Sequence, residues 1–232
     1  MSAYIVATVK PWNVAAYRRH VGSLPGSWTL VESREALTAE LIERIKPRFV
    51  FFPHWSWKVP QDVLDRAECV CFHMTDVPYG RGGSPVQNLI VRGRRDTMVS
   101  ALKMVAAFDA GPVYLKHPLA LAGPAQAIYE QMAEVIFGMI AEIARSEPQP
   151  TPQVGEATEI FSRRTPDQSE LPKTSSPEQL YNFIRMLDAE TYPPAFLNWG
   201  EFRSEFFDAS IDGDVVTARV VIRKRSSEHS DD

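Results

Sequence analysis

The chain has 232 residues, 44% of them apolar, which suits one substantial domain plus a smaller one with a core that needs no disulfide. Its 25 Lys and Arg against 29 Asp and Glu give a net charge of -4, which argues against a tRNA substrate without excluding a local basic patch. No apolar run approaches the roughly 20 residues that span a bilayer, and the first residues do not read as a secretion signal, so we expect a cytoplasmic protein without a membrane partner.

The first half of the chain alternates short apolar runs with helical patterns. Strands are predicted at residues 4–9, 28–31 and 49–52, and helices at 10–20 and 37–45, the second helix ending before Pro47. No Gly-x-Gly-x-x-Gly follows the first strand, so the backbone has no glycines there to approach a pyrophosphate. A nucleotide-binding dehydrogenase of the Rossmann type is therefore unsupported.

The loop after the third strand, residues 53–58, holds His54, Trp55 and Trp57. Flat rings with polar edges suit an aromatic-walled slot that covers and orients a heterocycle. Packing of either tryptophan onto the sheet edge is an equally good interpretation.

Residues 69–90 are where we expect the chemistry. An apolar run at 69–72 delivers His73 to the start of a loop that turns at Pro78 and Gly80 and carries Arg81 between glycines. In open α/β sheets ligands sit at the carboxyl ends of strands, although a buried strand followed by a tight surface turn would give the same pattern. The only cysteines, Cys69 and Cys71, share one face of this strand without disulfide geometry, and two thiols make a poor metal site, so we expect reduced thiols and no metal.

Three ordered motifs carry a family resemblance. His73 is followed by Val77-Pro78, by Arg81-Gly82-Gly83-Ser84-Pro85 and, 36 residues after the His, by Asp109-Ala110-Gly111. The chain thereby resembles the formyltransferases that use 10-formyltetrahydrofolate, whose signature is Asn-x-His, Leu-Pro, Arg-Gly-x-x-Pro and an Asp-x-Gly loop at this distance. Further matches at 59–64, 111–113, 118–119, 163–166 and 183–196 extend the resemblance, the last two toward enzymes that formylate nucleotide-linked amino sugars or initiator tRNA.

The resemblance implies roles for individual residues. An amine attacks the formyl carbon, His73 hydrogen-bonds the resulting oxyanion, and Asp109 orients the imidazole and relays a proton. The residues expected to bind the cofactor are His54, Trp55, Trp57, Val59, Val105 and Phe108, and those expected to bind the substrate are Asp76, Tyr79, Arg81, Gly82 and Gly83. Two have local alternatives, because Asp76 can cap the turn and Arg81 can form a local salt bridge.

One position departs from the family pattern, because Cys71 stands where the family has Asn. A thiol is a weak donor and has no amide NH₂. Loss of one oxyanion donor costs roughly 10²- to 10³-fold in rate, so either activity is diminished or another group has taken the role. Asn88 is the first candidate, and we count it as catalytic with His73 and Asp109. His54 is the second.

The later part of the chain predicts further elements. Residues 98–107 are expected to form a strand by family analogy, although 101–104 fit a helix equally well, and 113–116 form another strand. A long helix starts after Pro124, and its apolar stripe from Ile128 to Ile143 belongs to the core. Ser176-Pro177-Glu178-Gln179 predicts a capping box for a helix that ends at residues 192–194, and 202–209 with 215–222 predict a two-strand hairpin.

The predicted architecture is α/β. It comprises a Rossmann-like formyltransferase domain with a mostly parallel sheet at residues 1–147, a proline-rich linker at 148–175, a small α+β domain at 176–223 and a disordered tail at 224–232. The expected function is transfer of a formyl group from 10-formyltetrahydrofolate to an amino sugar, which we expect to be nucleotide-linked. Two alternatives stay open, a folate- or nucleotide-sugar-binding protein that has lost transfer and a hydrolase that passes formyl to water, and a homodimer is left open.

Overall fold

The computed structural model describes residues 1–174 and 176–225. The chain forms two compact units, which are described separately because their relative position is not determined. The first comprises Met1–Pro85, Asp96–Ala120 and Tyr129–Ser162, and the second comprises Val86–Arg95, Leu121–Ile128 and the chain from Arg163. Across the described residues, no helix combines the length and apolar character that crossing a membrane requires.

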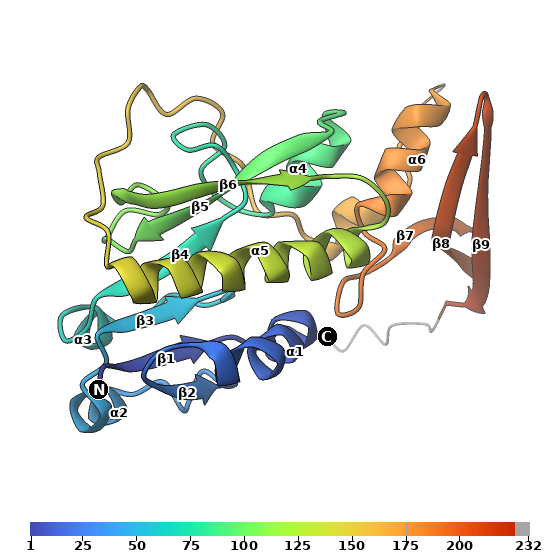
Figure 1. Cartoon of the computed structure of the whole chain (residues 1–232). Helices are drawn as coiled ribbons and strands as arrows, with labels where there is room; N and C mark the ends of the chain where they lie inside the picture. The colour runs from blue at the N-terminus through green and yellow to red at the C-terminus, as the bar shows by residue number, and fades with distance from the viewer. Residues whose placement is uncertain (175, 226–232) are drawn as a thin grey trace, which may run out of the picture. The chain divides into compact units, whose positions relative to one another are not determined.

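The first unit is built on a six-stranded sheet with the order β2-β1-β3-β4-β5-β6 (Figure 1). β1 to β4 pair in parallel, whereas β5 and β6 pair antiparallel. This confirms the predicted α/β class with a mostly parallel sheet. The strands are β1 (Ala3–Ala7), β2 (Ser27–Val31), β3 (Phe49–Phe52), β4 (Cys69–His73), β5 (Asp96–Lys103) and β6 (Val113–Ala120).

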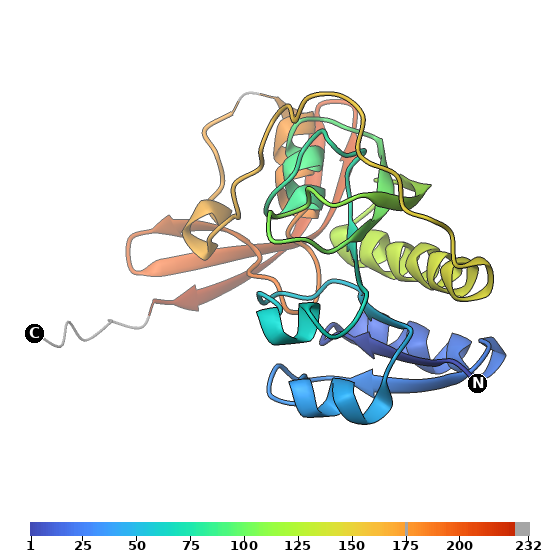
Figure 2. The same ribbon diagram turned by 90° about the vertical axis from the view of Figure 1, so that its left-hand side faces the viewer.

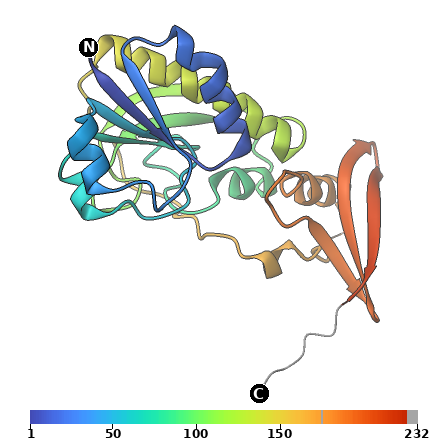
Figure 3. The ribbon, with the colours of Figure 1, turned by 90° about the horizontal axis from the view of Figure 1, so that it is seen from below.

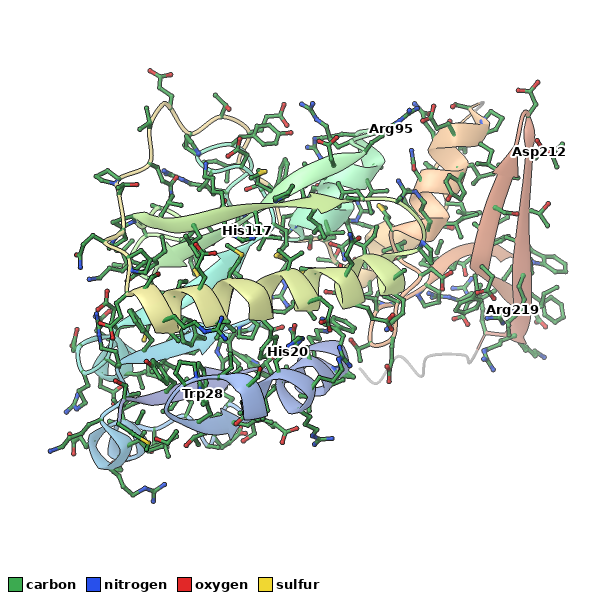
Figure 4. All side chains as sticks on the ribbon, in the orientation of Figure 1. His20, Trp28, Arg95, His117, Asp212 and Arg219 are labelled. Carbon is green, nitrogen blue, oxygen red and sulfur yellow. The ribbon has the colours of Figure 1, made fainter. Side chains whose placement is uncertain are left out.

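Helices cover both faces of this sheet, because alternate residues of each strand point to opposite sides. Ile5, Val50 and Cys69 point to the face covered by α2 (Ala39–Ile45) and α3 (Gln61–Leu64). On the other face the Tyr4 hydroxyl donates to the Ala144 carbonyl of α5 (Ala125–Ser146), and α1 (Pro11–His20) lies beside α5. Figure 3 shows the two pairs of helices on opposite sides, and Figure 4 labels His20, whose Nε2 lies 2.7 Å from a Glu134 carboxylate oxygen of α5.

β5 is a strand, as the family analogy predicted, but it ends at Lys103 and not at Ala107. The Met104 N–H donates to the Cys69 carbonyl at 2.8 Å, and the chain then leaves the sheet. Gly111 allows the return, since a Cβ there would lie 1.7 Å from the Lys103 carbonyl oxygen. The early end of β5 thus creates the loop that carries Asp109.

The second unit contains a three-stranded antiparallel sheet with the order β7-β8-β9 (Figure 2). Its elements are α4 (Pro85–Val91), which starts at the last residue of the first unit, the first turn of α5, the 3-10 helix η2 (Pro166–Ser169), α6 (Pro177–Arg185), β7 (Ala195–Trp199), β8 (Phe202–Asp212) and β9 (Val215–Lys224). The predicted hairpin is β8–β9, and sequence reasoning missed β7 and α4. Arg219 of β9 binds Asp208 of β8 at 2.7 Å (Figure 4).

Helix α6 corrects two predictions. It ends at Arg185, before the prolines at 193 and 194. The chain turns there, and the Asp188 carbonyl accepts the Gln126 N–H of α5 at 3.0 Å. The buried Arg185 donates to the carbonyls of Leu121 and Gly123 at 2.7 and 2.8 Å. Only half of the predicted capping box forms.

The Ser176 hydroxyl accepts the Gln179 N–H at 3.3 Å, as the capping box requires. The reciprocal bond is replaced, because the Thr174 hydroxyl accepts the Ser176 N–H and itself donates to the Gln179 side chain. A complete capping box lies instead at Thr165 and Gln168.

The predicted domain boundaries at residues 148 and 176 stay a prediction. Residues 148–162 belong to the first compact unit, where the Thr151 and Val113 main chains exchange hydrogen bonds at 2.7 and 2.9 Å. Of the predicted tail, Lys224 ends β9, and residues 226–232 lie outside the described residues.

Candidate active site

His73 ends β4, at the carboxyl edge of the parallel strands, and its side chain is 7% exposed. Its Nε2 lies 2.9 Å from the Gly80 carbonyl oxygen, and its Nδ1 lies 3.5 Å from a carboxylate oxygen of Asp109. A neutral imidazole carries one N–H and donates to one acceptor only. With both ring nitrogens facing an oxygen acceptor, an imidazole that gains a second N–H during the reaction can donate to both the Gly80 carbonyl and the Asp109 carboxylate.

The Asp109 carboxylate contacts both His73, at the end of β4, and the Arg-Gly-Gly loop. The φ of Asp109 is +52°, a left-handed conformation in which Asp is one of the better-tolerated residues. One carboxylate oxygen faces His73, and the other accepts the Gly82 N–H at 2.9 Å. The structure thus brings together two residues that stand 36 positions apart.

The Arg-Gly-Gly loop is held by main-chain contacts with the segment after α5. The Phe161 N–H donates to the Arg81 carbonyl at 2.7 Å, and the Gly83 N–H donates to the Phe161 carbonyl at 2.8 Å. Gly82 has φ +110°, and a Cβ there would lie 2.2 Å from the Phe161 carbonyl oxygen. Glycine is therefore required at position 82 for the two chains to approach.

Three of the predicted substrate-binding residues have partners within the first unit. The Asp76 carboxylate pairs with Lys116, whose ammonium group also donates to the Val77 carbonyl at 2.7 Å. The Tyr79 hydroxyl donates to Glu159 at 3.4 Å. Arg81 donates twice to the Gln153 side-chain oxygen, at 3.2 and 2.7 Å. Within residues 1–174 and 176–225 it forms no salt bridge, and the neutral amide of Gln153 does not cancel the guanidinium charge.

The aromatic loop after β3 divides into a packed part and an exposed part. Trp55 and Val59 pack in the core cluster beside α2 and α3, so a ligand contact of Val59 would use its main chain. The Trp57 side chain is 39% exposed, and its ring meets Trp55 edge to face at 5.0 Å. For Trp55 the structure favours packing onto the sheet, whereas Trp57 remains available to a ligand.

His54 lies in an aromatic cluster in the first unit. It has φ +54°, and its ring centre lies 5.5 Å from that of Trp12 and 5.1 Å from that of Tyr129. Burial, and then the nearby Lys10 cation, lower the pKa of His54 to about 3. The ring is therefore neutral at neutral pH.

The loop after β5 exposes the two remaining residues of the predicted cofactor site. Val105 is 42% exposed and Phe108, next to Asp109, is 75% exposed. Large apolar side chains at such exposure beside a buried polar pair are a feature of a ligand surface.

Cys71 lies on the same face of β4 as His73 and is half-buried. Burial, and then the negative charge of Asp109, raise the pKa of the Cys71 thiol to about 12. The group is a neutral thiol at neutral pH, so it is neither a nucleophile nor a substitute for an amide donor.

Asn88 lies on α4 in the second unit and is 9% exposed. Its main-chain and side-chain oxygens both accept from an Arg92 nitrogen, at 2.8 and 3.1 Å. Both bonds are accepted by oxygens of Asn88, and the donor role proposed for this residue stays a hypothesis.

Sequence reasoning missed Gln153, Phe161 and Lys116. Gln153 and Phe161 lie in or beside the proline-containing stretch that predicted a surface linker, and no spacing rule connects them to His73. Gly82 was the available signal, because a glycine inside a charged loop can mark a close approach of two main chains.

Comparison with known proteins places the chain in a family. A family model described as the C-terminal domain of methionyl-tRNA formyltransferase matches residues 166–223. A solved structure, a methionyl-tRNA formyltransferase from Clostridium thermocellum, is 40% identical with a TM-score of 0.93, and the match covers 97% of this chain and 100% of that one. The chain belongs to the methionyl-tRNA formyltransferase family.

This membership confirms the resemblance found in the sequence. A curated methionyl-tRNA formyltransferase from Gluconobacter oxydans is 28% identical over 142 residues, which are 60% of this chain and 46% of that protein. The chain spans 25% to 58% of the length of the first curated formyltransferases that it matches. A 4-N formyltransferase from Francisella tularensis, 15% identical with a TM-score of 0.64 over 84% of this chain and 92% of that one, shares the fold.

Proposed function

We propose that this member of the formyltransferase family transfers a formyl group from 10-formyltetrahydrofolate to an amine. The observation that carries the proposal is the His73–Asp109 pair at the end of β4, tied to the Gly82 N–H. Nucleophilic attack on a formyl carbon puts negative charge on oxygen and leaves a proton to be moved, and an imidazole with a carboxylate behind it can serve both needs.

The exposed apolar residues of the first unit fit a folate. Trp57, Val105 and Phe108 are each at least 39% exposed and belong to the loops after β3 and β5, so burying them under a heterocycle would remove apolar surface from water. The folate would be held by these three with the main chain of Val59 and the neutral ring of His54, and Trp55 would support the Trp57 ring from within the core. When bound, it supplies the activated formyl group.

The protein's own groups account for the remaining requirements. His73 can turn its Nε2–H from the Gly80 carbonyl to a substrate oxygen, exchanging one oxygen acceptor for another. Asp109, fixed by the Gly82 N–H, stays beside Nδ1 and stabilises positive charge on the ring. The low exposure of both side chains limits the screening of this interaction by water.

For the acceptor we propose an amine on a nucleotide-linked sugar. Arg81 follows β4 and pairs with a neutral amide, so its charge can meet a phosphate. The net charge of -4 gives no general attraction for a long polyanion. Methionyl-tRNA is the second candidate, and the names of the family model and of the 40%-identical structure favour it.

Two assays test this function together. A folate analogue is expected to quench or shift tryptophan fluorescence, with a smaller effect in Trp57→Phe, because the pterin would exclude water from that indole. Mass spectrometry of a panel of amino-sugar nucleotides and methionyl-tRNA, each with the formyl donor, should show the gain of one formyl group on one class.

The outcomes of the two assays separate the alternatives. Folate binding with no formylated product would indicate a binding protein, and formate release in the absence of an amine would indicate a hydrolase. A formylated tRNA whose formation falls steeply with added salt would replace the sugar by the tRNA as acceptor.

The presence of Cys71 in place of the family's Asn leads to a second prediction, which concerns the missing oxyanion donor. If Asn88 supplies the donor that Cys71 lacks, Asn88→Ala should lose roughly 2.7 to 4 kcal/mol of transition-state stabilisation. Cys71→Asn in that background should then recover part of the loss, measured as a double-mutant cycle on kcat/KM. His54→Ala is the parallel variant. Near-wild-type turnover in both Asn88→Ala and His54→Ala would rule out a relocated donor.

A further inference from the structure

The segment that follows α5 contributes side chains and main chain to the candidate site. In Figures 1 and 2 this gold-coloured segment leaves α5 and returns beside the loop that follows β4. The Thr158 carbonyl accepts the Gly80 N–H at 3.0 Å, and Phe161 pairs with Arg81 and Gly83. Gly80 and Gly82 are the residues whose main chains contact His73 and Asp109. The segment therefore supports the loop that holds the pair.

Gln153 is the side chain through which this segment reaches the Asp109 loop directly. Its Nε2 donates to the carbonyls of Asp109 and Gly111, both at 2.8 Å, and its oxygen accepts two bonds from Arg81. Arg81 can only donate and a carbonyl can only accept, so the orientation of the amide is fixed by its partners. Both donors and both acceptor positions of the Gln153 side-chain amide are therefore engaged.

These bonds act at a point of backbone strain. Asp109 is a non-glycine residue at φ +52°, a conformation that persists only when its surroundings hold it. The two bonds from Gln153 fix the main chain at Asp109 and at Gly111, the second residue after it. The orientation of that main chain sets where the Asp109 carboxylate lies relative to His73 Nδ1, at 3.5 Å.

We propose that Gln153 is a positioning residue of the active site, which fixes the Asp109 loop against Arg81 and so aligns the Asp109 carboxylate with His73. The proposal rests on the proposed formyl transfer for its kinetic consequence. The alignment itself is a property of the protein without any ligand, so it can be tested separately.

Gln153→Glu is the sharpest variant, because it keeps the size of the side chain and an acceptor for Arg81 but removes both donors to the Asp109 loop. Gln153→Met removes the same donors without adding a charge. Both are expected to lower kcat by about 10- to 100-fold and to change the KM for the formyl donor by much less, since the loss is one of alignment. Val154→Ala, at a neighbouring side chain that is 90% exposed, is the matched control and should behave as wild type.

Amide hydrogen exchange in the ligand-free protein gives the independent readout. The Gly82 N–H, which the Asp109 carboxylate accepts, should exchange faster in both Gln153 variants, while the core amide of Val99 keeps its protection. Unchanged Gly82 exchange, or wild-type kcat in Gln153→Met, would overturn the positioning role. A wild-type protein that transfers no formyl group while Gly82 exchange responds as expected would overturn the proposed function and leave the alignment standing.

Discussion

His73→Ala is expected to reduce formyl transfer by at least about 10²- to 10⁴-fold, the range that general acid–base groups supply. The imidazole is the group placed to donate to an oxygen that gains charge, and alanine has no donor. The fold should persist, because His73 lies at a strand end and the β4 pairing between His73 and Ser100 is made by the main chain. The Gly80 carbonyl loses its partner, which should destabilise the protein by about 1 to 3 kcal/mol.

Steady-state kinetics and thermal unfolding of the same preparation check this expectation. His117→Ala is the matched control, because His117 lies on β6 of the same sheet and pairs with Glu142 at the surface (Figure 4). A soluble His73→Ala protein with wild-type specific activity would remove His73 from the mechanism.

Asp109→Asn should lower kcat by about 10²- to 10⁴-fold with little change in the affinity for folate. Asparagine tolerates the left-handed conformation at this position and can still accept the Gly82 N–H. The variant therefore removes the charge beside His73 Nδ1 and keeps most of the geometry, so the loss in rate reports electrostatic stabilisation.

The rate of Asp109→Asn is compared with its folate binding, measured by tryptophan fluorescence, and with the rate of Asp65→Asn. Asp65 is an exposed carboxylate of the first unit that accepts from the Gln61 side chain at 2.8 Å, so this control tests loss of a carboxylate outside the proposed site. Turnover in Asp109→Asn equal to that of wild type would exclude the carboxylate from the reaction.

Most of the strands, the class of the sheet and the family could be predicted from the sequence alone. Each of these depends on residues close together in the chain or at a fixed spacing, such as the buried run Phe49–Phe52 or the interval between His73 and Asp109. Alternation and spacing record local backbone geometry, which any strand of this kind must obey.

How the side chains of the site are held depends on contacts between residues far apart in the chain, which became visible in the folded structure. Gln153 binds the Asp109 loop across 44 positions, Lys116 binds Asp76 across 40, and Trp55 packs in the core while Trp57 stays exposed. The early end of β5 and the presence of β7 likewise became visible only in the folded structure. A prolyl segment such as 148–155 carries no local pattern that reveals its partners, because the bonds of Gln153 follow from the path of the chain after α5 and from the shape of the loops it meets.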